Sequence, residues 1–107
     1  MIAKRVSILT YEGDRSGGGL VQRKLLAMLS DAAVEVATIV PTVAGYTKRM
    51  GITTKFLADA GGRLPLIVEF IASPDETQRL LPAIRTMVGQ RTLTITDVEI
   101  DMPIHAL

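Results

Sequence analysis

The sequence predicts an α+β fold of the ferredoxin-like type, with the element order β-α-β-β-α-β. Four segments are rich in β-branched residues, and two segments carry apolar residues at helical spacing. A strong helix start at Ser73 fixes the place of the second helix. In this pattern, two helices pack on one face of a four-stranded antiparallel sheet.

The first half of the chain supplies a strand, a helix and a second strand. Residues 6–11 are largely apolar on both alternating faces, which is typical of a central strand. After a run of glycines, residues 20–32 carry one apolar stripe and form an amphipathic helix. Residues 34–43 are dense in β-branched side chains. Pro41 lacks a ladder donor, so this strand is expected at a sheet edge or at a bulge.

The second half repeats the order strand, helix, strand. Residues 64–72 are apolar on both faces except for Glu69, which predicts a second central strand. Ser73 followed by Pro74 is an N-cap with proline at the first helical position, and Gly89 ends this helix. In the last strand, residues 92–100, the apolar positions change phase, which predicts a bulge near Asp97.

Size and composition narrow the class of protein. A chain of 107 residues, 48% hydrophobic, is expected to form one domain over residues 1–107. The absence of cysteine removes disulfides and thiol chemistry, and the cytoplasm is the expected location. A net charge of +1 gives no global attraction for nucleic acid, and no apolar run is long enough for membrane insertion. The tail 101–107 holds the only histidine, His105, and no chemistry is expected there.

Alternating strand directions bring three connections to one end of the predicted sheet. They are residues 12–19, residues 45–63 and residues 89–91. All three contain glycine, and they share a basic set made of Arg15, Lys48, Arg49, Lys55, Arg63 and Arg91. Such a positive, glycine-rich rim predicts an anion site. Each of these features also has an interpretation without a ligand. Arg15 can form a surface ion pair, and the cations of the long loop can be solvated charges. The glycine run can be a flexible turn.

The sheet face without helices also needs a partner. Leu9, Tyr11, Ile67 and Ile71 supply apolar side chains to strands that the two helices cover on one side only. An apolar face of that size is rarely left in water by monomers, so oligomerisation through the sheet is expected.

Several stretches together resemble the PII signalling superfamily. They are residues 43–48 (VAGYTK), residues 64–69 (LPLIVE), residues 73–75 (SPD) and residues 94–99 (TITDVE). The opening Glu12-Gly13-Asp14-Arg15 and the short turn before the last strand are more similar to the branch of PII-like domains than to the true PII nitrogen regulators. The resemblance covers nearly the whole chain.

The resemblance implies a homotrimer that is not an enzyme. It implies an adenine nucleotide (ADP, ATP or AMP) in the cleft between subunits, with a small anion such as bicarbonate beside it. A flexible loop, residues 46–63 here, would change shape to engage a partner such as a membrane transporter. Nitrogen and inorganic-carbon control both remain open as pathways.

The resemblance also carries roles to individual positions. Gly45 and Tyr46 match the turn at the loop root, Lys48 matches a basic residue near phosphate, and Leu64 matches an apolar wall for the base. The remaining predicted nucleotide-binding residues are Arg15, Gly89, Gln90 and Arg91, and the predicted partner-binding loop contributes Thr47, Arg49 and Lys55. True PII proteins have a longer glycine- and lysine-rich phosphate loop where this chain has only Gly89-Gln90-Arg91-Thr92.

Two other functions stay open alongside the nucleotide sensor. One is a ferredoxin-like interaction module without a small ligand, whose basic loop would meet an acidic protein surface. The other is a metal-binding trimer similar to the CutA family, although the chain lacks cysteine and any internal histidine. Catalysis is not expected, because a nucleophile needs a positioned base and none is apparent.

Overall fold

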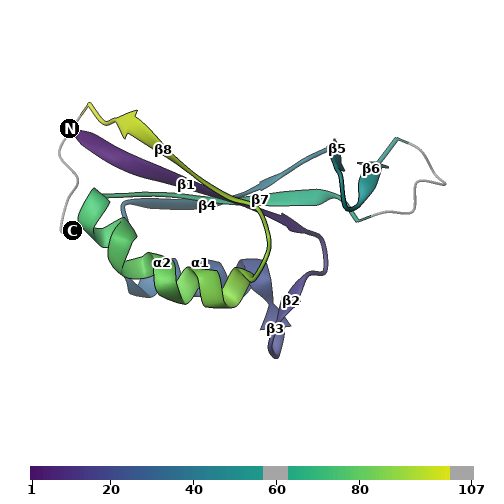
Figure 1. The fold of residues 1–107 in the computed structure, drawn as a ribbon, viewed down its shortest axis with the longest axis horizontal. Helices are drawn as coiled ribbons and strands as arrows, with labels where there is room; N and C mark the ends of the chain where they lie inside the picture. Colours follow the sequence, from purple (N-terminus) through teal and green to yellow (C-terminus); the bar gives the residue numbers. More distant parts are fainter. Residues whose placement is uncertain (57–62, 102–107) are drawn as a thin grey trace.

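The fold is one antiparallel sheet with two helices on a single face (Figure 1). The computed structural model describes residues 1–56 and 63–101. The strand order in the sheet is β4-β7-β1-β8, and every neighbouring pair is antiparallel. The sheet strands and helices are β1 (Ile2–Tyr11), α1 (Val21–Asp31), β4 (Val36–Pro41), β7 (Pro65–Ala72), α2 (Pro74–Val88) and β8 (Leu93–Glu99). The predicted α+β ferredoxin-like fold is therefore confirmed.

The core lies between the sheet and the two helices. Because side chains alternate along a strand, Val6 and Ile8 of β1 share a face with Phe70 and Val68 of β7, their direct partners. All four are almost completely buried. The helices and the remaining strand positions complete the core with Val21, Leu25, Leu29, Ala72, Ile84 and Val88.

Local signals placed the ends of several elements correctly. The Ser73 hydroxyl accepts a hydrogen bond from the Glu76 N–H at 3.2 Å, so the predicted N-cap of α2 is present. Gly89 follows the last helical residue with φ +61°, a conformation that favours glycine. Pro41 is the last residue of β4, and β4 is an edge strand, as the missing ladder donor required.

The predicted bulge near Asp97 is wrong. The pairing of β1 with β8 runs without interruption from Ile2–Glu99 to Ile8–Leu93. Strand β8 is an edge strand and most of its side chains are half-buried or exposed. A change in apolar phase therefore costs little there, and the strand keeps its regular register.

The connection expected as one open loop, residues 46–63, begins as an ordered hairpin. Strands β5 (Ala44–Thr47) and β6 (Gly51–Thr54) pair in antiparallel register and project from the sheet at the end away from the N-terminus (Figure 1). Gly51, with φ +71°, ends the turn between them. Residues 57–62 of this connection, and 102–107 of the predicted tail, lie outside the described part. A smaller hairpin, β2 (Arg15–Ser16) with β3 (Gly19–Leu20), precedes α1.

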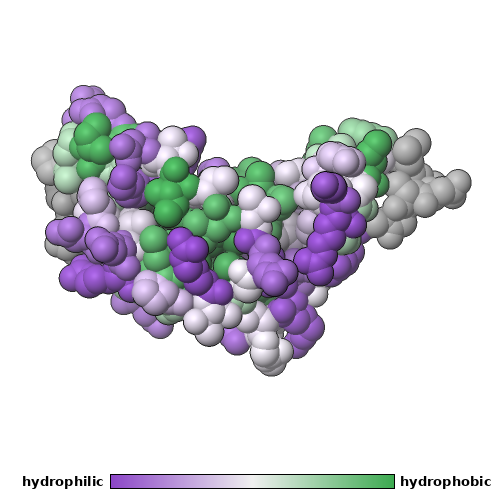
Figure 2. Space-filling model, viewed as in Figure 1, coloured by the Kyte–Doolittle hydropathy of each residue, from purple (hydrophilic) through white to green (hydrophobic). Residues whose placement is uncertain are grey.

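The helix-free side of the sheet, called here the open face, carries a mixed surface. The register places Leu9 beside Ile67, and Val40 on the other side of Ile67. The hydroxyl of Ser7 donates to Glu69 Oε1 at 3.0 Å in the middle of this face. Hydrophobic side chains gather in the hollow between the sheet and the hairpin (Figure 2). The expected apolar residues are thus on the open face.

Among the described residues, no helix is long and apolar enough to cross a membrane.

Candidate functional site

Three connections meet at the end of β1, as the strand directions predicted. Tyr11 at the end of β1 pairs with Pro65 at the start of β7, and the Leu9 N–H donates to the Thr92 carbonyl just before β8. The connection 46–63 is called here the long connection, and the places where it joins β5 and β7 are called its N-terminal and C-terminal roots. The turn after β1, the roots of the long connection and the turn after α2 are therefore neighbours. This end of the sheet holds the candidate site.

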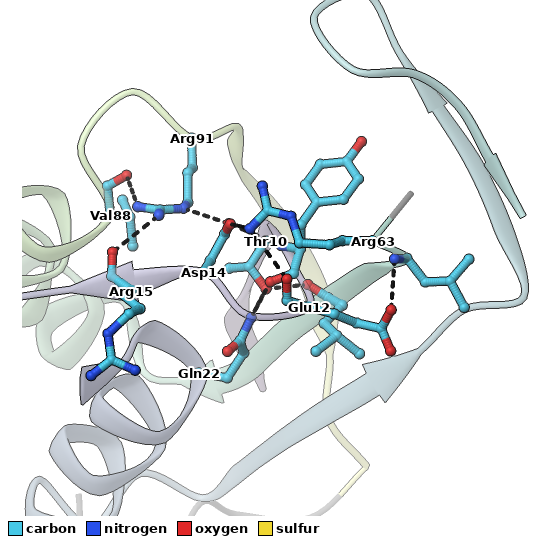
Figure 3. A network of polar contacts seen from close by, with 11 residues as sticks. Thr10, Glu12, Asp14, Arg15, Gln22, Arg63, Val88 and Arg91 are labelled. Atoms are coloured by element: carbon cyan, nitrogen blue, oxygen red, sulfur yellow. Dashed lines mark hydrogen bonds and ion pairs between the residues drawn. The ribbon is translucent and has the colours of Figure 1, made fainter. Parts of the chain in front are cut away.

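Asp14 is at the centre of this cluster (Figure 3). Its Oδ2 accepts hydrogen bonds from Arg91 Nε and from the Tyr11 N–H, both at 3.0 Å. Its Oδ1 accepts from Arg63 Nη1 at 2.9 Å. The Asp14 side chain is only 13% exposed. One carboxylate thus joins two arginines that come from two different connections.

Arg91 lies between the end of α2 and the first loop. Its Nη1 donates to the Val88 carbonyl at 3.0 Å, and its Nη2 lies 3.4 Å from the Arg15 carbonyl oxygen. With Nε on Asp14, each guanidinium nitrogen has a protein acceptor. Each Nη still carries a second hydrogen, so the group can accept an anion without leaving its place.

Glu12 closes the C-terminal root of the long connection. Its Oε1 accepts from the Leu64 N–H at 2.8 Å, and its own N–H donates to the Leu64 carbonyl at 2.9 Å. Arg63 Nη1 also approaches the Glu12 carbonyl oxygen at 3.3 Å. This root is therefore fixed to β1 by both side-chain and backbone contacts.

The N-terminal root is fixed by close packing and by one hydroxyl pair. A Cβ on Gly45 would lie 2.7 Å from Pro65 Cγ, so only glycine fits against that ring. The hydroxyl of Tyr11 lies 3.0 Å from Thr47 Oγ1, which also accepts from the Met50 N–H. These contacts hold the hairpin β5–β6 at the edge of the site.

A cleft of about 400 Å³ opens between these roots and the turn after α2. Leu9, Tyr11, Met50 and Val88 give it an apolar wall. Its charged residues are Asp14 and three arginines, so its formal charge is positive. Its lining residues are Leu9, Tyr11, Asp14, Thr47, Arg49, Met50, Arg63, Val88, Gly89, Gln90, Arg91 and Thr92.

The residues predicted from the sequence divide into groups. Those that line the cleft are Thr47, Arg49, Gly89, Gln90 and Arg91. Gly45 and Leu64 lie at the roots of the long connection and hold it in place. Those that do not line the cleft are Arg15, Tyr46, Lys48 and Lys55.

The predicted residues that do not line the cleft have other surroundings. Arg15 Nη2 donates to the Gly18 carbonyl at 2.9 Å, and only the Arg15 backbone contacts Arg91. Tyr46 is 69% exposed on the hairpin. Lys55 lies over the ring of Phe56, with Nζ 5.6 Å from the ring centroid. The nucleotide-binding roles of Arg15 and Tyr46 and the partner-binding role of Lys55 remain predictions.

Asp14 was not among the residues of the predicted anion site, and Arg63 was predicted only as one of the basic residues of the rim, yet the two connect the cluster. The sequence carried a signal only for the turn, because Gly13, with φ +80°, precedes Asp14. In that turn the Asp14 N–H donates to the Tyr11 carbonyl, and the Asp14 side chain accepts from the Tyr11 N–H. The sequence carried no signal for the ion pairs of Asp14, because Arg91 is 77 positions away. Among residues 1–56 and 63–101, no three His, Cys, Asp or Glu side chains are grouped to hold a metal ion.

Comparisons with known proteins concern the fold and the family of this chain. A UPF0166 protein of Aquifex aeolicus (strain VF5) is 29% identical over 99 residues, which cover 91% of each chain. Among solved structures, CPII from Thiomonas intermedia K12, a nitrogen regulatory PII-like protein bound to ADP, AMP and bicarbonate, superposes with a TM-score of 0.63 at 14% identity. That match covers 94% of this chain and 96% of CPII. The apo form of CPII gives a TM-score of 0.56 at 11% identity, over 96% of each chain.

The structural matches confirm the fold that the resemblance predicted. At the sequence level, the model of the family DUF190 (Uncharacterized ACR, COG1993) matches residues 3–100. This chain therefore belongs to the DUF190 family and has the fold of PII-like proteins.

Proposed function

We propose that this chain is a regulatory protein, not an enzyme, that binds an adenine nucleotide in the cleft beside Arg91. Binding would reorder the connection 46–63 and so change its affinity for a partner. The observation that carries the proposal is the cleft itself, which combines an apolar wall with an excess of arginine at the root of that connection.

The chemistry of the lining suits the two halves of a nucleotide. A base can pack against Leu9 and Met50, and phosphates can meet the guanidinium groups across the cleft. The Arg49 side chain lines the cleft and makes no hydrogen bond or ion pair within the described residues, so its charge is available for a ligand. CPII, which has the same fold, is described as bound to ADP, AMP and bicarbonate, and this supports the same ligand classes here.

The proposal includes a homotrimer. The open face exposes apolar side chains in a single chain, including Val36 and Val40, and a trimer built through this face would bury them. The cleft would then lie at the border between subunits, as the PII resemblance implies.

The hairpin is the proposed contact for the partner. Tyr46, Ile52 and Phe56 are about 70% exposed, and Lys48 and Lys55 lie among them. Large exposed apolar and aromatic groups that lie together are typical of interaction sites. A membrane transporter or another regulated protein is the proposed partner.

These same exposed residues favour a second candidate function. A ligand-free interaction module would use the hairpin alone and leave the cleft empty. The metal-binding trimer has less support, because the described residues provide no cluster of metal ligands.

Thermal unfolding with ATP, ADP, AMP and cyclic AMP separates these functions. A ligand at 100 times its dissociation constant stabilises the native state by about 2.7 kcal/mol, which raises the melting temperature by roughly ten degrees in a domain of this size. We expect such a rise with one nucleotide, and light scattering should give the mass of three chains. Arg49→Ala and Arg91→Ala should remove the rise.

The matched control is Arg23→Ala, which removes an exposed arginine that does not line the cleft. This variant should keep the full rise. If no nucleotide shifts the melting temperature of the parent, the ligand-free interaction module becomes the better account.

A further inference from the structure

We propose that Asp14 is an internal anion that competes with the ligand for the arginines of the cleft. Its carboxylate holds Arg63 and Arg91, and a phosphate-bearing ligand competes with it for these two guanidinium groups. The inference rests on the proposed function for the identity of the ligand, but the competition itself applies to any phosphate group.

The geometry of the carboxylate carries the first step. Its two oxygens are divided between the two guanidinium groups, Oδ2 with Arg91 Nε at 3.0 Å and Oδ1 with Arg63 Nη1 at 2.9 Å (Figure 3). Phosphate oxygens form the same kind of charge-assisted contact with guanidinium groups. Asp14 therefore occupies hydrogen-bond positions that a phosphate group would use.

The balance of charges in the cleft is the second observation that supports the proposal. Arg49, Arg63 and Arg91 line the cleft, and Asp14 is the acidic residue among its lining. Its negative charge offsets one of the three positive charges and repels an incoming anion. With its side chain only 13% exposed, this repulsion is weakly screened by solvent. Asp14 should consequently weaken anion binding and restrict it to ligands with several negative charges.

The position of Arg63 in the chain is the third observation that supports the proposal. Arg63 precedes Leu64 at the C-terminal root of the long connection, and Asp14 is 49 positions away in the sequence. Its side chain is 50% exposed, against 26% for Arg91, so the Arg63 ion pair is more strongly screened by solvent and is the easier of the two to break. Displacing Asp14 would transfer the hold on Arg63 from the first loop to the ligand, while the Glu12–Leu64 contacts keep the strand in register. Asp14 thus links occupancy of the cleft to the connection 46–63.

The test compares Asp14→Asn with the parent by calorimetric titration, using inorganic pyrophosphate and ADP as probes. The asparagine oxygen still accepts from the Tyr11 N–H, so the turn is retained while the charge is removed. We expect pyrophosphate to bind Asp14→Asn about tenfold more tightly than the parent. Asp31→Asn removes the same charge from an exposed position at the end of α1 and should leave the affinity unchanged.

Limited trypsin digestion of the ligand-free proteins tests the hold on Arg63. Cleavage after Arg63 should be several-fold faster in Asp14→Asn, while cleavage after Lys55 in the same digest should not change. As a measurement on the parent alone, the Arg91 Nε–H resonance should shift when pyrophosphate saturates the cleft, because its Asp14 acceptor is replaced.

The outcomes distinguish this inference from the proposed function. If ADP binds the parent but Asp14→Asn binds pyrophosphate equally or more weakly, Asp14 only positions the arginines and the inference is overturned. If pyrophosphate binds Asp14→Asn more tightly but no nucleotide binds better than pyrophosphate, the inference stands and the nucleotide proposal fails. If no anion binds the parent or the variant, both fail.

Discussion

The two phenylalanines of this chain lie in opposite environments. Phe70 of β7 is 1% exposed between the sheet and the helices, whereas Phe56, just after the hairpin β5–β6, is 71% exposed. The two tyrosines divide in the same way, with Tyr11 8% exposed and Tyr46 69% exposed. The sheet buries its aromatic residues, whereas the hairpin and the residues just after it leave theirs on the surface.

The difference comes from the number of partners each region has. The sheet buries one face against two helices, whereas β5 and β6 pair only with each other. An isolated two-stranded hairpin is marginally stable in water. The hairpin therefore depends on a few anchors, which are the Gly45–Pro65 packing, the Tyr11–Thr47 hydroxyl pair and the Lys55 N–H to Val43 carbonyl bond. Regions with few anchors open more easily than the core.

Truncating each phenylalanine should give the largest contrast between these regions. Phe70→Ala removes a fully buried ring and is expected to lower the free energy of unfolding by about 3–5 kcal/mol. Phe56→Ala removes an exposed ring and should change it by no more than about 0.5 kcal/mol. Urea denaturation measures both. Equal losses of unfolding free energy in the two variants would mean that Phe56 belongs to the same cooperative unit as Phe70, and this would contradict the difference between the hairpin and the sheet.

Elements defined by local signals were predictable from the sequence. The start of α2 needs only Ser73 and Pro74, and both are correctly placed, since capping depends on residues within one turn. The shared end of the three connections was also predictable, because strand direction alternates along the chain. The bulge near Asp97 was not, since an apolar phase change has a structural meaning only on a strand with a covered face.

The hairpin and the polar cluster could not be predicted with the same tools. Residues 44–54 are short strands around a basic turn, and their composition resembles that of a loop. Asp14 and Arg91 are joined only after the sheet has brought two turns together, and sequence periodicity contains no information on such side-chain pairs. The general position of the site was therefore predictable, but its central residue was not.

A methyl group at the hairpin root should have an intermediate effect. Gly45→Ala would place Cβ 2.7 Å from Pro65 Cγ, so the hairpin or the start of β7 must move. Such overpacking is expected to cost about 1–3 kcal/mol in the free energy of unfolding. Gly18→Ala is the control, because nothing lies within 4 Å of its added Cβ and its stability should be unchanged or slightly raised. Urea denaturation measures both variants. If Gly45→Ala has the same free energy of unfolding as the parent, the contact between residue 45 and Pro65 can adjust to a methyl group, and the prediction is wrong.

The smallest expected effect belongs to the hydroxyl that connects the two regions. Tyr11→Phe removes the hydroxyl that lies 3.0 Å from Thr47 Oγ1, and it should lower the free energy of unfolding by about 0.5–1.5 kcal/mol. Tyr46→Phe removes a hydroxyl from an exposed ring and should have almost no effect. Because the lost contact anchors the hairpin, amide hydrogen exchange should accelerate in residues 44–54 of Tyr11→Phe more than in β1 or β7. Uniform acceleration across the sheet would instead place Tyr11 within the core alone, and the hairpin would then be held by the Gly45–Pro65 packing and its remaining backbone contact with Val43.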